Sequence, residues 1–184
     1  MTDRFRAVSR PLLFMDVDGV LCPVHDNTQP KSYHAPSADF RPASFEHWET
    51  GETIELWISP SNAHRLARLA HAFEIVWATG WERHANRVIA PLHGLAELSF
   101  VELSWSEDMR SLETSWKLPA VARYAGDDRP CVWIDDDIRS DTERWAANRR
   151  GQTLLIRVDH RVGLTDAAVE RALAFAHALR GAPT

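Results

Sequence analysis

The chain has 184 residues, of which 45% are hydrophobic, and this is enough for one domain with a real core. Its net charge of −5 and its lack of any Lys/Arg run exclude the electrostatic footprint of a protein that binds duplex nucleic acid or an anionic membrane. No apolar run approaches the roughly 18 residues of a membrane helix, and two cysteines make no disulfide framework or thiolate metal site. We expect a soluble, cytoplasmic protein with a single domain over residues 1–184 and no membrane partner.

Residues 12–21 are predicted to form a buried strand and a turn that carries two carboxylates. Residues 12–15 lack the alternation of a half-exposed strand, which indicates a central parallel strand covered on both faces. In open α/β sheets ligands bind beyond the carboxyl ends of strands, where Asp16 and Asp18 fall, and Gly19 lets the backbone leave the strand sharply. Two such carboxylates repel each other unless a cation binds them, which indicates Mg²⁺; a merely polar turn is the alternative.

The rest of the chain alternates helices with strands after an irregular segment. Prolines punctuate the segment up to about Glu49, so we expect a flap over about residues 22–58, with residues 53–58 as a short strand of the flap or of the sheet edge. Further strands are expected at residues 74–78, 98–103, 132–134 and 153–158, and helices from near Ser61 (as N-cap), Glu82, Leu118, Asp141 and Thr165 (as cap). This alternation predicts a three-layer α/β/α Rossmann-like fold with a parallel sheet.

Polar residues with chemical potential follow these later elements. Thr79 offers a hydroxyl and Gly80 an amide at a strand end, both suited to hold a phosphoryl oxygen; a turn hydrogen bond is the alternative for Thr79. Lys117 lies near a helix start, where a cation opposes the helix dipole unless an anion is bound as well. A solvated surface lysine is the alternative interpretation.

Three adjacent carboxylates, Asp135, Asp136 and Asp137, end the apolar strand at residues 132–134. They would repel one another strongly without a cation or a basic partner, so at least one should face a metal. Pairing with Arg139, or a plain acidic surface loop, is the alternative.

Taken together, these motifs resemble the four motifs of the haloacid dehalogenase-like (HAD) hydrolases. Asp-x-Asp-Gly-Val-Leu after an apolar strand is similar to the first motif, and the others follow in order. The segments that resemble them are Val76-Trp77-Ala78-Thr79-Gly80, Lys117 and Val132-Trp133-Ile134-Asp135-Asp136-Asp137. The resemblance spans residues 12 to about 137 and implies the strand order 3-2-1-4-5, with a small cap or flap inserted after the first strand.

The resemblance also implies roles for the acidic residues. Asp16 would be the nucleophile that forms an aspartyl-phosphate, and Asp18 the acid that protonates the leaving oxygen and later activates water. Mg²⁺ would be bound by Asp16, the backbone carbonyl of Asp18 and Asp135, with Asp136 acting through water. Thr79, Gly80 and Lys117 would hold the phosphoryl group.

Aromatic residues and histidines are the remaining candidates for substrate contacts. Of eight tryptophans, Trp81 follows the second motif and Trp48 lies in the expected flap. Both are candidates for lining the substrate pocket, and a structural role is the alternative for each. His47 belongs to the same group, together with His25, His34 and His84.

The function expected from these residues is a Mg²⁺-dependent phosphatase that hydrolyses a small phosphate monoester. One alternative is a nucleic-acid-end phosphatase, which the lack of a basic groove disfavours. Another is a binding or regulatory protein that keeps the fold without turnover, which the filled motif positions disfavour.

Overall fold

The computed structural model describes residues 10–23, 39–103 and 114–181, and its centre is a five-stranded parallel sheet. The strands lie in the order β5-β4-β1-β6-β7. Their bounds are β1 (Leu12–Met15), β4 (Glu74–Trp77), β5 (Ser99–Phe100), β6 (Cys131–Asp135) and β7 (Thr153–Arg157). Counted along the chain, this is the order 3-2-1-4-5, so the predicted Rossmann-like topology is confirmed.

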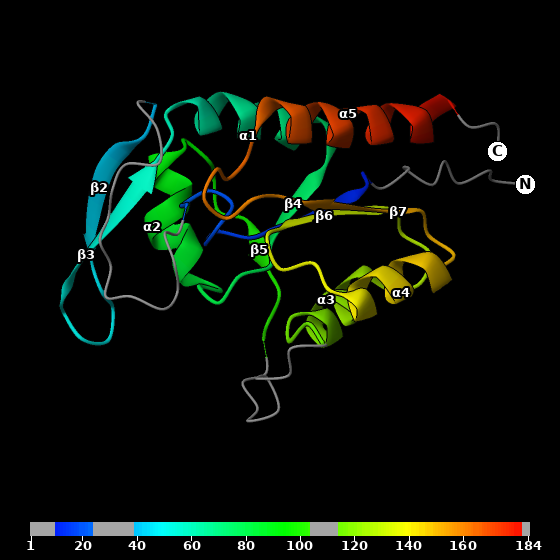
Figure 1. Ribbon diagram of the computed structural model, residues 1–184, viewed down its shortest axis with the longest axis horizontal. Coiled ribbons are helices and arrows are strands. Elements are labelled where there is room, and N and C mark those ends of the chain that lie inside the picture. Colours follow the sequence, from blue (N-terminus) through cyan, green and yellow to red (C-terminus); the bar gives the residue numbers. More distant parts are fainter. Residues whose placement is uncertain (1–9, 24–38, 104–113, 182–184) are drawn as a thin grey trace, which may run out of the picture.

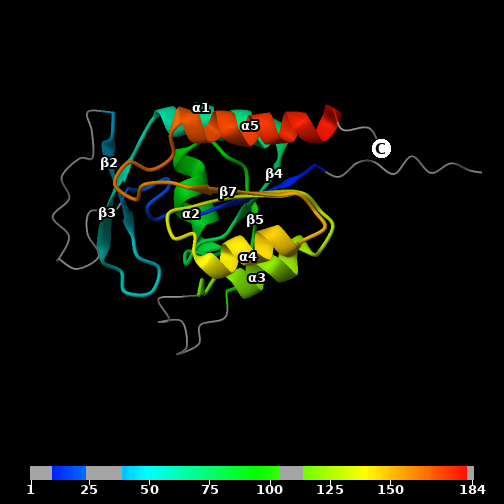
Figure 2. The same cartoon turned by 45° about the vertical axis from the view of Figure 1, so that its right-hand side comes forward.

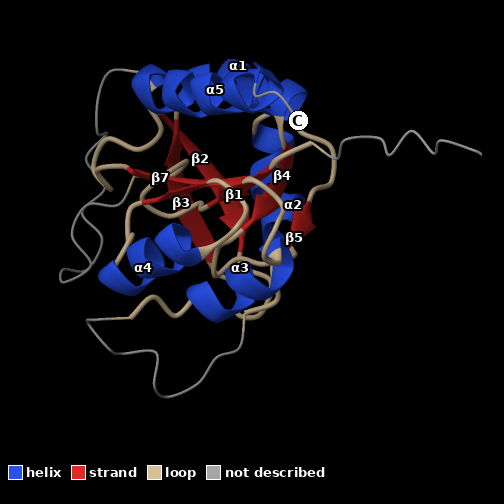
Figure 3. Cartoon of the chain, turned by 90° about the vertical axis from the view of Figure 1, so that its right-hand side faces the viewer, coloured by secondary structure: helices blue, strands red, loops and turns tan. Residues whose placement is uncertain are grey.

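Helices cover both faces of the sheet (Figures 1, 2 and 3). One face carries α1 (Ser61–Ala72) and α5 (Asp166–Gly181), which lie side by side, and the other carries α3 (Leu118–Ala125) and α4 (Ser140–Asn148). The remaining helix, α2 (His84–Leu92), packs its buried face into the same core as α1 and α5. The sheet is therefore the middle of three layers.

Strand β1 explains why the apolar run at residues 12–15 does not alternate. Leu13 and Met15 lie in the core beneath α1 and α5, whereas Leu12 and Phe14 lie in the core formed with α3. Burial on both faces requires an apolar residue at every position of a central strand. Met15 pairs with Trp77 on one side and with Ile134 on the other, so the three strands end at one edge of the sheet. The functional motifs follow at this edge.

A two-stranded antiparallel hairpin stands apart from the main sheet, at the left of Figure 1. It consists of β2 (Arg41–Glu46) and β3 (Thr53–Ile58), so residues 53–58 pair within the hairpin and not at the edge of the main sheet. The expectation of irregular chain up to Glu49 is wrong for Arg41–Glu46. Pro42 and the largely exposed side chains of β2 hide the strand from sequence patterns. The rest of the predicted flap, residues 24–38, lies outside the described residues.

Several predicted element ends need correction. Ser61 is the first residue of α1 and does not cap it, because Pro60 occupies the N-cap position. The helix expected from Glu82 begins at His84, and the strand expected over 98–103 is limited to Ser99–Phe100. Thr165 does cap α5, since its Oγ1 accepts a hydrogen bond of 3.2 Å from the amide of Ala168.

Within the described ranges, no helix combines the length and the apolarity that crossing a membrane would require.

Candidate active site

Asp16 occupies the first position after β1 and is held by both of its carboxylate oxygens. Oδ1 accepts a 2.8 Å hydrogen bond from the amide of Val17, and Oδ2 accepts one of 2.6 Å from Nζ of Lys117. The carboxylate is 4% exposed. These two contacts fix its orientation at the carboxyl edge of the sheet.

The turn after Asp16 is closed by hydrogen bonds of its own backbone. The carbonyl of Val17 accepts from the amides of Val20, Leu21 and Cys22 at 3.2, 2.8 and 2.9 Å. Gly19 has a φ of +74°, which L side chains rarely adopt, and a Cβ there would lie 2.5 Å from Cγ of Asp136. Glycine is therefore required for its backbone and for the close approach of the fourth motif.

Lys117 bridges the first and fourth motifs. It lies at the N-cap position of α3 and is 6% exposed, and its Nζ donates to Asp16 and, at 2.8 Å, to Oδ2 of Asp135. Burial alone would lower the pKa of Lys117, but the two carboxylates raise it above its ordinary value, so the ammonium stays charged. The alternative of a solvated surface lysine is wrong.

The three consecutive aspartates differ in the contacts that they make. Asp135 ends β6, is 1% exposed, and also accepts hydrogen bonds from Nε1 of Trp133 (3.1 Å) and the amide of Asp137 (2.9 Å). The carboxylate of Asp137 forms an ion pair of 2.6 Å with Arg139. The pairing with Arg139 considered from the sequence therefore holds for Asp137.

Asp16, Asp135 and Asp136 form a group that fits a hard cation. One carboxylate oxygen from each lies within 4.8 Å of the others. Burial raises the pKa of Asp16, Lys117 opposes this rise, and the charges of Asp135 and Asp18 add to it. Burial and then the charge of Asp135 raise the pKa of Asp136. A divalent cation bound through oxygen would offset this repulsion, so the donor set fits Mg²⁺.

The side chain of Asp18 lies outside this group of three. It is exposed, and its Oδ2 accepts a 2.9 Å hydrogen bond from Nε1 of Trp81. Thr79 is fully buried after β4, and its Oγ1 accepts from the amide of Trp81 at 3.4 Å, while Gly80 is exposed. Trp81 thus lies between the first and second motifs and contacts both, which the sequence did not indicate.

An aromatic cluster joins the β2–β3 hairpin to the start of α2. The ring of Trp48 stacks on His84 with a centroid distance of 4.0 Å and an angle of 6°, and Trp48 lies 5.6 Å from Trp81. His47 stacks on Trp48, and its Nδ1 accepts amide hydrogen bonds within the hairpin turn. These contacts place the hairpin beside Asp18. Substrate contacts by Trp48 and His47 stay a prediction, and His25 and His34 lie outside the described residues.

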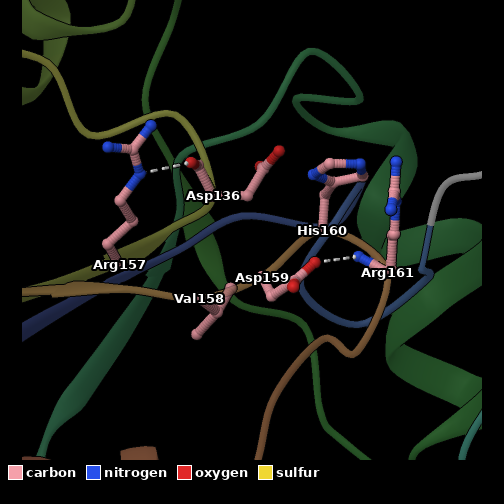
Figure 4. Close-up of a pocket in the computed structure, with 6 residues that line it drawn as sticks. All are labelled: Asp136, Arg157, Val158, Asp159, His160 and Arg161. Carbon is pink, nitrogen blue, oxygen red and sulfur yellow. Dashed lines mark hydrogen bonds between the residues drawn. The ribbon is translucent and has the colours of Figure 1, made fainter. Parts of the chain in front are cut away.

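The residues that follow β7 were not predicted to belong to the site. A pocket of about 460 Å³ opens there, next to the acidic group (Figure 4). Its lining residues are Asp136, Arg157, Val158, Asp159, His160 and Arg161. The available signal was the run of polar residues after a strand whose carboxyl end meets the same edge as Asp16 and Asp135.

One comparison with known proteins identifies the family of the chain. A family model described as the HAD domain in Swiss Army Knife RNA repair proteins matches residues 12–169. Among solved structures, the chain is similar to a variant of the fission yeast RNA polymerase II CTD phosphatase Fcp1 bound to beryllium fluoride, with 18% identity and a TM-score of 0.41. The match covers 94% of this chain and 51% of that one, so the chain spans about half the length of this relative. No curated protein sequence matches the chain.

Proposed function

The chain belongs to a family of HAD-like hydrolases, the HAD domains of Swiss Army Knife RNA repair proteins, and we propose that it is a Mg²⁺-dependent phosphatase. The proposed reaction is the hydrolysis of a phosphate monoester through an aspartyl-phosphate on Asp16. The observation that carries the proposal is the convergence of three motifs on one point. Lys117 donates to Asp16 and Asp135 at 2.6 and 2.8 Å, and both carboxylates belong to the group that fits a cation.

Asp16 is the proposed nucleophile. One of its carboxylate oxygens attacks the phosphorus atom in line with the leaving oxygen, so that the bond to Asp16 forms as the ester P–O bond breaks. A phosphate dianion repels an incoming carboxylate, and the ammonium of Lys117 counteracts this repulsion from within hydrogen-bonding distance. The amide of Val17 keeps the carboxylate from rotating away.

The metal would be held by Asp16, Asp135 and Asp136, with the backbone carbonyl of Asp18 as a further ligand. Bound there, Mg²⁺ would supply positive charge to the nucleophile and the phosphoryl oxygens. The support for this assignment is the buried set of carboxylates whose repulsion a cation would relieve.

Asp18 is the proposed general acid and base. It protonates the leaving oxygen in the first step; in the second it accepts a proton from the water that attacks phosphorus and releases Asp16. Its exposed position gives the leaving group and water access, and the indole N–H of Trp81 orients its carboxylate. The hydroxyl of Thr79 and the amide of Gly80, at the neighbouring strand end, are the proposed contacts of the phosphoryl oxygens.

A second candidate is a phosphatase that acts on the phosphorylated end of a nucleic acid. The description of the matching family, which names RNA repair proteins, favours it. The net charge of −5 argues against a large basic groove, so such a substrate would be bound at its end only.

The proposal is tested by hydrolysis of a panel of phosphorylated metabolites, nucleotides and end-phosphorylated oligoribonucleotides, in Mg²⁺ and in EDTA. We expect phosphate release in Mg²⁺ and its loss in EDTA and in Asp16→Asn, whose amide is a poor nucleophile. Asp128→Asn is the matched control, because this exposed carboxylate precedes β6 at the opposite edge of the sheet. Hydrolysis by Asp16→Asn near the wild-type rate would exclude the covalent mechanism, and a strong preference for oligoribonucleotides would select the second candidate.

A further inference from the structure

The pocket beyond β7 shares a wall with the proposed metal site. Asp136 lines the pocket and also belongs to the group formed with Asp16 and Asp135. Figure 4 shows Arg157 beside Asp136, and His160 and Arg161 farther along the same opening. A molecule bound at Asp16 could therefore extend into this pocket.

Basic side chains of this pocket keep unused hydrogen-bond donors. Nε of Arg157 donates to the backbone carbonyl of Asp136 at 3.2 Å, which holds the side chain at the pocket. Among the described residues, the terminal nitrogens of Arg157, the guanidinium of Arg161 and the imidazole of His160 have no hydrogen-bond or ion-pair partner. Arg139, by contrast, is paired with the carboxylate of Asp137. In the described part of the chain, the pocket arginines therefore form no ion pair with the acidic group.

The turn that carries His160 and Arg161 is closed by Asp159. Its carboxylate accepts a 2.9 Å hydrogen bond from the amide of Arg161, and its carbonyl accepts from the amides of Val162 and Gly163 at 2.9 and 2.8 Å. The acidic side chain of this turn is thus occupied with its own backbone. The other carboxylate of the lining, Asp136, belongs to the proposed metal group, so the two guanidinium groups are the positive charges that the pocket offers to a ligand.

The same turn is fastened to the loop that carries Asp16 and Asp18. The amide of Leu164 donates to the carbonyl of Val20 at 2.7 Å, and a Cβ on Gly163 would lie 2.5 Å from that carbonyl oxygen. Gly163 also has a φ of +74°, so this contact needs glycine. The spacing between the nucleophile and the basic pocket is therefore fixed by the backbone.

On the basis of the function proposed above, we propose that this pocket binds a second phosphate group of the substrate, so that the preferred substrates carry two phosphates. Guanidinium groups recognise phosphate oxygens through paired, charge-assisted hydrogen bonds, and two of them with unused donors line this pocket. Phosphorus chemistry occurs at Asp16 while Arg157 and Arg161 bind the second group. The second group could be a monoester or a phosphodiester.

The first test compares kcat/KM for adenosine 3′,5′-bisphosphate with those for the two adenosine monophosphates, and includes a 5′-phosphorylated dinucleotide as the phosphodiester probe. We expect the wild type to prefer a two-phosphate substrate at least tenfold, the factor that corresponds to about 1.4 kcal/mol. The ratio of the kcat/KM values for the two-phosphate and one-phosphate substrates should fall toward one in the double variant Arg157→Gln/Arg161→Gln. It should recover in part in the double variant Arg157→Gln/Arg161→Lys. Arg171→Gln, at an exposed arginine of α5, is the matched control and should keep the wild-type ratio.

The second test measures binding and does not depend on turnover. Two variants are titrated calorimetrically in the presence of Mg²⁺: Asp16→Asn alone, and Asp16→Asn combined with the two arginine substitutions. Each is titrated with the bisphosphate and with each monophosphate. We expect at least tenfold tighter binding of the bisphosphate, and loss of that difference in the combined variant. Equal dissociation constants, or a difference that survives both arginine substitutions, would overturn the second-phosphate site. Hydrolysis of mono- and bisphosphates without preference would overturn the second-phosphate site but leave the proposed phosphatase activity in place. Absence of any hydrolysis would refute the phosphatase activity, and the titration would then decide whether the second-phosphate site exists.

Discussion

Replacing Lys117 by Met should destabilise the protein because it leaves two buried carboxylates without their cation. Nζ of Lys117 lies 2.6 Å from Asp16 and 2.8 Å from Asp135, and all three side chains are at most 7% exposed. Methionine keeps most of the apolar stem, so the change removes a charge and leaves little empty space.

The size of the loss follows from these contacts. At an effective dielectric constant of about 20, a charge pair at this distance attracts with roughly 6 kcal/mol, and the cost of desolvating the charges cancels much of it. Removing one partner of a buried pair costs about 3–5 kcal/mol, because the other charge remains buried and unpaired. This is a large fraction of the roughly 5–15 kcal/mol that stabilises a typical domain.

The assay is urea unfolding in EDTA, followed by the fluorescence of the eight tryptophans. Arg150→Met is the matched control, since its 2.7 Å pair with Asp128 is exposed and should contribute about 0–1 kcal/mol. Adding Asp16→Asn to Lys117→Met should recover part of the loss, because one unpaired charge is then removed. A loss below about 1 kcal/mol for Lys117→Met would show that the two buried carboxylates need no cation from the protein.

Three further predictions address the turn, the general acid and a buried histidine. Gly19→Ala should cost about 1–3 kcal/mol in urea unfolding, since the new Cβ would lie 2.5 Å from Cγ of Asp136 at a φ of +74°; wild-type stability would contradict this. Trp81→Phe keeps an aromatic ring but removes the N–H donor to Asp18, so kcat should fall most for esters with poor leaving groups, and an equal loss for all esters would count against an oriented acid. Burial lowers the pKa of His93 to about 4, below the ordinary 6.5, so the unfolded state binds the proton first as the pH falls. The free energy of unfolding should therefore fall by about 2 kcal/mol between pH 7 and pH 5. His93→Gln should lack this part of the pH dependence, and a slope identical to that of the wild type would contradict the prediction.

The fold could be predicted from the sequence where burial is complete. The apolar run of β1 and the alternation of helices and strands indicated the parallel sheet, and the structure confirms it. Strand β2 could not be predicted in this way. Its side chains are exposed or half-buried, it contains Pro42, and it pairs only with β3 outside the main sheet. Without a buried face, no periodicity marks such a strand.

The acidic residues of the site were predictable because each follows a strand that ends at the same edge of the sheet. The position of Lys117 between Asp16 and Asp135 was not, because it depends on how α3 packs against β1 and β6. The contact between Trp81 and Asp18 was missed because it joins residues that are far apart in the sequence. The pocket beyond β7 brings Asp136 together with residues that follow another strand, and only the polar run after that strand pointed to it.

Phosphorylation of Asp16 during turnover can be measured by mass spectrometry of the acid-quenched enzyme after mixing with a hydrolysed phosphate ester and Mg²⁺. We expect a phosphoryl group on the peptide that contains Asp16, and its absence in Asp16→Asn. With an aryl phosphate, whose leaving group needs little protonation, the adduct should accumulate in Asp18→Asn, where the base for the second step is missing. Steady phosphate release with no adduct on Asp16 in either the wild type or Asp18→Asn would contradict the covalent mechanism.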